Sequence, residues 1–313
     1  MAWLADSPSG VYRDHALSST VRMQAYEDTV LYQFVQPEPG YGKGKGQSLT
    51  YTRIGKLASA GRVADTDYLP SVRPSVTTGV VSVSEWGAKT QLTEFEVDIT
   101  HFELEPQLKE AFTNQISLTT DEMASTSLKA TPIRYTPVTT GGVFVTNGTV
   151  TQVADKNLTV IDVQNIRDYL KRNLLCPYYA NQRYVGCLST TAARGIKNDP
   201  LYKDWFVFRP EKAAFVKSYV ASFEDIDFYE TNNDNVLDNS AGSTTVLGQA
   251  LFFGADAARV AVIRDPELRM SAVKSDLGRF WELGWVGTLE TFAPWSTATT
   301  GATTARSVYV TSA

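Results

Sequence analysis

Residues 48–100 alternate between apolar and polar side chains with the two-residue period of β-strands. Three runs follow this pattern, at 48–53, 76–84 and 90–100. In the third run, apolar side chains fall near one face and three carboxylates fall on the other. Four glycines at alternate positions from Gly40 to Gly46 precede these runs. We therefore predict an extended β-rich loop with a flexible entry and one apolar face that a partner must cover.

After Thr100 the spacing of apolar residues lengthens to three and four, which predicts one long amphipathic helix ending near Leu128. Its apolar positions include Leu104, Leu108, Ala111, Phe112, Ile116 and Met123. Serine and threonine are frequent in this helix and are mediocre helix formers, so packing against the rest of the protein must stabilise it.

The second half of the chain alternates short helices and strands. A second helix begins near Leu158, because Thr159 and Asp162 have the spacing of a capping box, and it ends before Pro177. Strands are predicted at 183–188, 226–231, 247–253, 258–263 and 278–291. Short helices are predicted at 19–34 and 210–219, and an arm or loose tail at 298–313. The fold class that follows is α+β.

Composition agrees with a folded protein and narrows the possible functions. Of the 313 residues, 43% are hydrophobic and 20% are charged, which argues against disorder. The net charge of −5 is opposite in sign to what a nucleic-acid binder needs. No run of residues is long and apolar enough for a membrane span, and the first ten residues lack the features of a signal peptide. We expect a soluble protein made in the cytosol.

The sequence offers no catalytic, cofactor or metal site. His15 and His101 are the only histidines, and no nucleophile motif accompanies them. The glycine and lysine run near Lys45 does not fit a phosphate-binding loop. Cys176 and Cys187 lack the spacing of a redox or zinc pair and are expected to be buried thiols.

Two further groups of residues are better explained by structure than by chemistry. The carboxylate-rich stretches at 94–98 and 224–230 are most simply solvated strand faces. Trp281, Trp285 and Trp295 could stack on a ligand, but aromatic side chains at these spacings more often fill a core or an interface.

The order of the predicted elements resembles that of a known family. It consists of an arm, a loop preceded by glycines, a long helix and then a mixed domain. Several short segments strengthen the resemblance, namely Ser84-Glu-Trp-Gly87, Gln91-Leu-Thr-Glu94, Leu158-Thr-Val160, Leu170-Lys-Arg-Asn173 and Asp225-Ile-Asp-Phe-Tyr-Glu-Thr-Asn232. Taken in order over nearly the whole chain, these features resemble the major capsid proteins of tailed phages with the HK97-like fold, in the podophage-type branch.

The resemblance implies a division of the chain into parts. These would be an N-terminal arm (1–39), an extended β-rich loop (40–100), the long spine helix of the peripheral domain (101–135), an axial domain (136–269), the return of the peripheral domain (270–295) and a C-terminal arm (296–313).

The resemblance also implies a function without enzymatic activity. The chain would assemble with itself into hexamers and pentamers of an icosahedral shell around double-stranded DNA, which it would enclose without reading its sequence. Its place would be the capsid of the virion, assembled in the host cytoplasm and with no membrane partner. Other expected partners are a portal protein, a separate scaffolding protein and a decoration protein.

Contacts between copies are expected to combine ion pairs with apolar burial. The candidate ion-pair residues are Arg53, Arg62, Arg73, Glu85, Lys89, Glu94 and Glu96. The candidate apolar contacts are Ile54, Leu57, Val76, Val81, Val83 and Trp86. Two alternatives remain open on the residues alone: a soluble β-rich carbohydrate-binding protein or hydrolase, and a tail or decoration protein of a virion.

Overall fold

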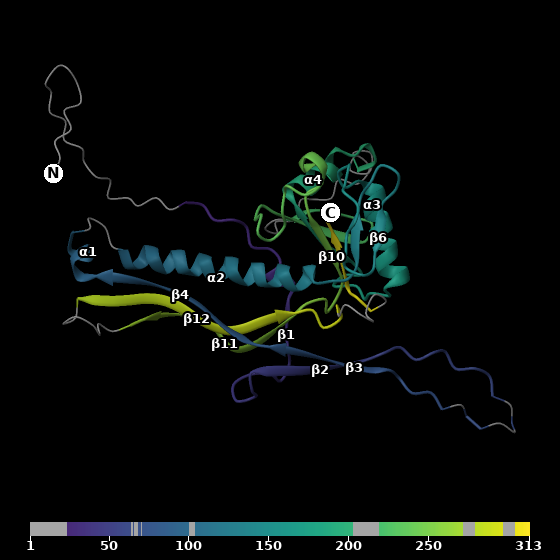
Figure 1. Cartoon of the computed structure of the whole chain (residues 1–313), viewed down its shortest axis with the longest axis horizontal. Coiled ribbons are helices and arrows are strands. Elements are labelled where there is room, and N and C mark those ends of the chain that lie inside the picture. The colour runs from purple at the N-terminus through teal and green to yellow at the C-terminus, as the bar shows by residue number, and fades with distance from the viewer. Residues whose placement is uncertain are drawn as a thin grey trace, which may run out of the picture.

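The computed structural model describes residues 24–63, 65, 68–69, 71–99, 104–202, 219–271, 279–296 and 304–313. Two sheets, one long helix and one projecting hairpin make up this part of the chain (Figure 1). No helix within it combines the length and apolarity needed to cross a bilayer.

The first sheet has four strands in the order β1-β11-β12-β4. Their bounds are Gln36–Pro37 for β1, Arg259–Met270 for β11, Phe280–Phe292 for β12 and Ser84–Thr93 for β4. Helix α2 (Leu104–Lys129) runs along this sheet, as Figure 1 shows, and its Phe112 packs on Leu283 and Trp285 of β12. Of the apolar positions expected on the long helix, Leu108, Phe112, Ile116 and Met123 pack against this sheet.

The second sheet has seven strands in the order β6-β5-β13-β10-β7-β9-β8. Their bounds are Val143–Val145, Arg134–Thr136, Ser307–Val310, Ala250–Phe253, Tyr184–Ser189, Ile226–Thr231 and Tyr219–Phe223 in that order. The smaller elements around it are α3 (Val160–Asp168), a π-helical turn (Tyr169–Asn173), α4 (Thr190–Asn198) and a 3₁₀ turn (Ser243–Thr245). Every residue of β7 and β10 is buried because both faces of this sheet are covered.

The start of α3 confirms the capping box expected from the sequence. The Thr159 side chain accepts a hydrogen bond from the Asp162 amide, and the Asp162 carboxylate accepts one from the Thr159 amide at 3.0 Å. The same carboxylate accepts the Tyr135 hydroxyl proton at 2.6 Å, which ties α3 to β5. Burial and this negatively charged acceptor raise the pKa of Tyr135.

The segment from Asp28 to Glu38 joins the two sheets. Its backbone meets the second sheet at Asn232, which accepts the Asp28 amide at 2.7 Å, and it continues into β1 of the first sheet. Between these points the 3₁₀ turn Tyr32–Phe34 lies beside α2, where the buried carboxylate of Asp121 accepts backbone N–H groups. The N-terminal segment is therefore part of the folded body from Asp28 onward.

Two sequence expectations on secondary structure are corrected here, and a third lies outside the described residues. Glu94–Ile99 is the short helix α1 and not the end of a strand, because Thr93 and Glu96 form a reciprocal capping box and β12 offers no partner beyond Phe280. Residues 24–30 carry no helix, although one was expected over 19–34. The helix expected at 210–219 lies outside the described residues up to 218, and Tyr219 begins β8.

Three further corrections concern which sheet a strand joins. The C-terminal segment was expected to be an arm, yet β13 is a fully buried strand between β5 and β10. Residues 259–269 were assigned to the axial domain, yet they form β11 of the four-stranded sheet, and β4 joins that sheet although it was assigned to the loop. Local alternation shows that a strand exists, but pairing between distant strands decides its place.

Candidate functional site: a hairpin with an uncovered face

The strands β2 (Ser48–Ile54) and β3 (Val76–Ser82) form a two-stranded antiparallel hairpin that projects from the body (Figure 1). All seven residues of each strand pair in register, from Ser48 with Ser82 to Ile54 with Val76. The Gly55 amide donates to the Ser75 carbonyl at 2.7 Å, which extends the ladder by one more hydrogen bond. An isolated hairpin of this kind is marginally stable in water, so contacts with other surfaces must support it.

The root of the hairpin is supported by its own subunit. The ring of Tyr51 stacks on Phe292 of β12, with centroids 5.2 Å apart and planes 29° apart. Tyr51 also lies across Gly79 of the partner strand, where an added Cβ would be 2.3 Å from the tyrosine ring. Leu49 and Val81 join this small core on the same face. The face of the hairpin that carries the odd-numbered residues is therefore partly covered.

The opposite face and the tip have no cover in the described residues. Thr50, Thr52 and Ile54 of β2 and Val76, Thr78 and Val80 of β3 share this face and are exposed. Ile54 and Val80 are 65% and 64% exposed. At the tip, Tyr68 is 98% exposed and Leu69 is 83% exposed. An uncovered apolar ribbon of this kind usually marks a surface that binds another chain.

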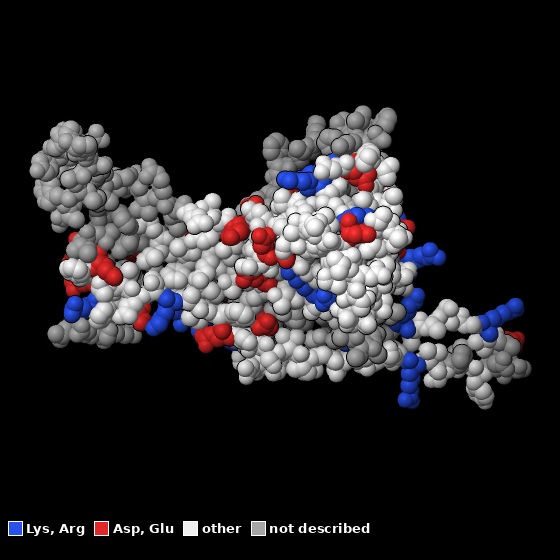
Figure 2. Space-filling model, turned by 45° about the horizontal axis from the view of Figure 1, so that its top comes forward, with Lys and Arg blue, Asp and Glu red and all other residues white. Residues whose placement is uncertain are grey.

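The hairpin is also positively charged. Residues 48–82 hold four basic side chains (Arg53, Lys56, Arg62 and Arg73) against two acidic ones. None of the four forms an ion pair within the described residues. Figure 2 shows basic groups standing out at the projecting end of the molecule, while both acidic and basic groups are spread over the body.

The structure places the sequence-predicted contact residues in three regions. Arg53, Ile54, Arg62 and Arg73 belong to the hairpin and its tip, as expected. Glu85, Trp86 and Lys89 lie on β4 of the four-stranded sheet, and Glu94 and Glu96 lie on α1.

Three of these residues have hydrogen-bonding partners within their own subunit, one of them Trp86, whose side chain bonds to Glu290. The Lys89 ammonium donates to the Glu282 carboxylate at 2.8 Å, and the Glu96 carboxylate accepts the Thr93 amide at 3.0 Å. The expected set is therefore not one patch in a single subunit, and its role in contacts between copies remains a proposal.

Two of the apolar contact candidates are corrected by their burial. Val83 is only 3% exposed and Val81 is half-buried, because both pack at the root of the hairpin against Ala261 and Phe292. They therefore stabilise their own subunit. Tyr68 and Leu69 were not among the predicted contact residues, although two large apolar residues beside a proline in a loop of small and polar residues are a signal visible in the sequence.

The other residues considered for chemistry have structural explanations. Trp285 is buried and donates its indole N–H to Gln115 at 2.9 Å, and Trp295 lies under the Arg306 guanidinium at 3.9 Å. Cys176 and Cys187 are buried free thiols, as expected, and burial raises the pKa of Cys176 to about 12.

The remaining groups considered for catalysis or metal binding give no site either. The carboxylates of Asp227 and Glu230 are bound in ion pairs with Arg183 and Lys197. Within the described residues no cluster of potential metal ligands occurs, and both histidines lie outside them.

In sequence, the chain matches none of the known protein-family models, and no curated protein shows significant similarity. In structure, it matches solved phage capsids over its whole length. The capsid asymmetric unit of cyanophage Pam1 aligns with a TM-score of 0.70 at 13% identity, covering 100% of both chains. The acid-stable capsid of Helicobacter pylori bacteriophage KHP30 aligns with a TM-score of 0.67 at 11% identity, covering 99% of this chain and 100% of the other.

A third structure, the capsid of Ralstonia phage GP4, aligns with a TM-score of 0.64 at 12% identity and covers 100% of this chain and 98% of the other. At such identities the similarity lies in the fold and not in conserved residues. Each alignment covers at least 99% of this chain. The chain therefore has the fold of phage capsid proteins, the HK97-like fold that its sequence resembles.

Proposed function

We propose that this protein is the coat protein of a phage capsid, and that many copies assemble into a closed shell of hexamers and pentamers around double-stranded DNA. The observation that carries the proposal is the uncovered hairpin, in a chain that aligns with capsid subunits from end to end. A strand ribbon with an exposed apolar face is a liability in a monomer, but it is an interface when each copy covers the hairpin of the next.

The energetics also favour assembly through many modest contacts. The hairpin holds its exposed apolar groups in an extended ribbon. Burial of these groups against a neighbour would stabilise the contact by roughly 25 cal/mol for each Å2 of apolar surface removed from water. The exposed basic groups would add less than about 1 kcal/mol for each surface ion pair. Contacts of this size allow a misplaced subunit to dissociate before the shell closes.

The proposal includes the surroundings of the shell. A portal protein, a separate scaffolding protein and a decoration protein are the proposed partners, and the host cytoplasm is the proposed place of assembly. The net charge of −5 suits a wall that encloses DNA without holding its phosphates tightly.

Electron microscopy of the purified chain, expressed alone and with a candidate scaffolding protein, tests this function. We expect closed shells or rings of five and six subunits in at least one of the two preparations. A monomer that persists in both, at concentrations where capsid proteins assemble, would contradict the proposal. A monomer that bound a carbohydrate would favour the alternative class.

A further inference from the structure

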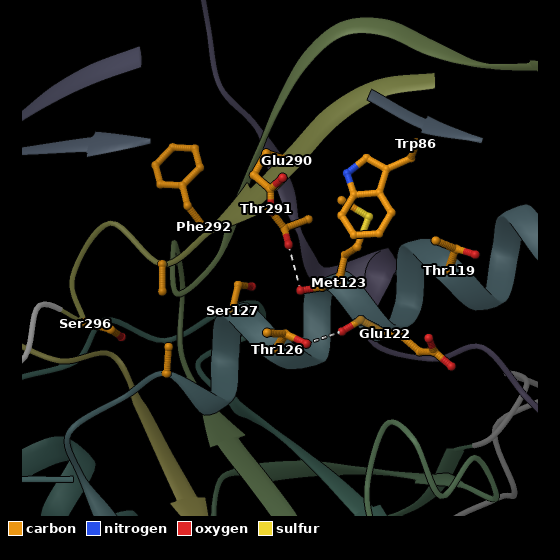
Figure 3. Close-up of a pocket in the computed structure, with 12 residues that line it drawn as sticks. Trp86, Thr119, Glu122, Met123, Thr126, Ser127, Glu290, Thr291, Phe292 and Ser296 are labelled. Carbon is orange, nitrogen blue, oxygen red and sulfur yellow. Dashed lines mark hydrogen bonds between the residues drawn. The ribbon is translucent and has the colours of Figure 1, made fainter. Parts of the chain in front are cut away.

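A hollow of about 430 Å3 lies where the second half of α2 faces the end of β12. Trp86 of β4 and Met123 of α2 point into it, and Thr291 and Phe292 of β12 close another side (Figure 3). The Thr291 hydroxyl donates to the Met123 carbonyl at 2.7 Å and holds the strand on the helix. Sites for small molecules are usually hollows of about 300 to 1,000 Å3 with mostly apolar walls and a few polar groups. This hollow has that size and mostly apolar walls.

The charged side chains around the hollow are acidic. Glu122 of α2 and Glu290 of β12 line it, and no lysine or arginine of the described residues does. Neither carboxylate forms an ion pair in this part of the chain. Glu122 accepts the side-chain amide of Asn235 at 2.9 Å, and Glu290 accepts the side chain of Trp86. A carboxylate accepts several hydrogen bonds, so both groups keep capacity for a positively charged donor.

Trp86 and Glu290 together favour a cation. Partial burial raises the pKa of Glu290, because the charged carboxylate is poorly solvated there. A cation beside this carboxylate would therefore be attracted more strongly than one at a fully exposed group. The hydrogen bond between the two side chains keeps the indole next to the carboxylate. An aromatic face attracts a cation within about 6 Å of its centroid, so one positive group can contact both residues.

Ser296 adds a buried polar group to the same hollow. Its side chain is 8% exposed and lines the hollow, yet its hydroxyl has no hydrogen-bond partner within the described residues. A buried polar group without a partner costs free energy. A hydroxyl accepts hydrogen bonds, and an ammonium N–H donates them. The hollow thus combines carboxylates, an indole and a hydroxyl, all of which can contact an ammonium group.

A second hollow, of about 590 Å3, also borders Trp86 but lacks this preference for positive charge. Lys89 and Arg269 line it beside two acidic residues. One of the two, Glu282, is already bound to the Lys89 ammonium at 2.8 Å. Opposite charges therefore balance in the second hollow, and it serves as a comparison within the same subunit.

We propose that the hollow between α2 and β12 binds an organic cation, in which an ammonium group is joined to an aromatic or aliphatic body. The apolar body packs on Met123 and Phe292. The ammonium group is attracted by the Trp86 ring and by the carboxylates of Glu122 and Glu290. This binding does not depend on the proposed function, because a single unassembled subunit carries the whole site.

Methyl NMR of the full-length, unassembled chain tests the site. The chain has four methionines, so labelling with 13C-methyl methionine gives four signals, and Met123→Leu identifies the signal of Met123. Met270 lines the second hollow and is the internal control. The probes are 2-phenylethylammonium, the neutral 2-phenylethanol and the anionic 3-phenylpropionate, which share one ring. We expect the ammonium probe to shift the Met123 signal saturably and the Met270 signal little, with a Kd about tenfold below that of the alcohol. The anion should bind most weakly.

Two matched variants test the role of the carboxylates. Glu122→Gln with Glu290→Gln should raise the Kd of the ammonium probe roughly tenfold and leave that of the alcohol nearly unchanged, because only the charged contacts are lost. Glu94→Gln with Glu110→Gln makes the same change in net charge at exposed residues outside the hollow, and it should bind as the wild type does. The methionine signals of each free variant show whether it is folded.

Several results would overturn the proposal. Equal affinities for the ammonium and the alcohol would show an apolar hollow without preference for cations. A shift of Met270 alone would place the binding in the second hollow. A Met123 signal that moves with the concentration of the chain alone would show that a second copy covers the site. Failure of the chain to form shells would overturn the proposed function and leave this binding site intact.

Discussion

At the scale of single residues, carboxylates fix the segments that run between the two sheets. Asp121 is fully buried on α2, and its carboxylate accepts the amides of Val30 at 3.2 Å and Tyr32 at 2.8 Å. Desolvation raises the pKa of Asp121 above the ordinary value of aspartate, and the hydrogen bonds from the backbone oppose this rise. The N-terminal segment is thus fixed to the long helix by one side chain.

Because the pKa of Asp121 is raised, its contribution to the stability of the fold should increase as pH falls. The folded chain binds a proton at Asp121 more tightly than the unfolded chain does. The stability gained from this proton is therefore largest below the ordinary aspartate pKa of about 3.9, and it is lost as pH rises through the raised pKa of the folded chain. Asp121→Asn cannot titrate. We expect the unfolding free energy of the wild type, minus that of Asp121→Asn, to increase as pH is lowered through this window in urea titrations of the unassembled chain.

Hydrogen exchange at neutral pH supplies a control for Asp121. Asp121→Ala should speed exchange at the Val30 and Tyr32 amides, because both lose their acceptor. Glu122→Gln alters the neighbouring carboxylate and leaves both of these hydrogen bonds in place, so the two amides should stay protected. Equal exchange in the two variants would contradict the assigned role of Asp121.

Asp256 has a similar role at the other crossing between the sheets. Its carboxylate accepts the indole N–H of Trp295 at 2.8 Å and the guanidinium of Arg306 at 3.0 Å, and it also pairs with Arg259. Asp256→Ala would leave the largely buried Arg306 without its counter-charge, so we expect a loss of about 3 kcal/mol in the unfolding free energy. Lys197→Ala removes a more exposed ion pair and should cost less than about 1 kcal/mol in the same chemical denaturation experiment.

At the scale of elements, the hairpin consists of a supported root and an unsupported tip. The root packs through Leu49, Tyr51 and Val81 on the first sheet, whereas residues 56–63 are all exposed. This division determines which part of the hairpin can be removed without harm to the subunit. A deletion that included β3 would also remove Val81 from the core at the root.

A deletion confined to residues 56–74, closed by a two-residue turn, should separate folding from assembly. The unfolding free energy of the subunit should change by less than about 0.5 kcal/mol, because the described residues of the tip are all exposed, while shells should no longer form. Tyr51→Ala is the contrasting variant, and loss of its stacking on Phe292 should destabilise the subunit by roughly 1 kcal/mol. Denaturation curves and electron micrographs of both variants give the comparison, and shells from the deleted chain would refute the role of the tip.

At the scale of the whole molecule, charge is distributed unevenly between the hairpin and the body. The hairpin carries a surplus of two basic residues in a chain whose net charge is −5. Opposite potentials on two surfaces of one subunit steer copies into head-to-tail encounters and disfavour contacts of hairpin with hairpin.

Reversal of the tip charges should slow assembly in a salt-dependent manner. We expect the Arg62→Glu, Arg73→Glu double variant to form shells more slowly at low salt, and the difference from the wild type to narrow toward 1 M salt, where the Debye length is about 3 Å. Light scattering during assembly measures both effects. The Arg172→Glu, Arg194→Glu variant makes the same change in net charge on exposed residues away from the hairpin, and it should assemble as the wild type does.

Much of the secondary structure was predictable from local patterns. The three- and four-residue period gave the long helix, the spacing of Thr159 and Asp162 gave the start of α3, and alternation gave both hairpin strands. Even the missed helix α1 had a local signal, since Thr93 and Glu96 have the spacing of a capping box. These features depend on contacts within a few residues, and such contacts are visible in the sequence.

The tertiary structure alone decided which strands share a sheet and which surfaces remain uncovered. Strand β13 lies between β5 and β10 because its pairing partners are distant in the chain, and nothing in its own residues specifies them. The hollow beside Trp86 exists because β4, β12 and α2 meet there. By itself the sequence determined the α+β class, the long helix and the exposed ribbon, because local periodicity encodes them, whereas long-range packing determined the sheets and the surfaces that remain uncovered.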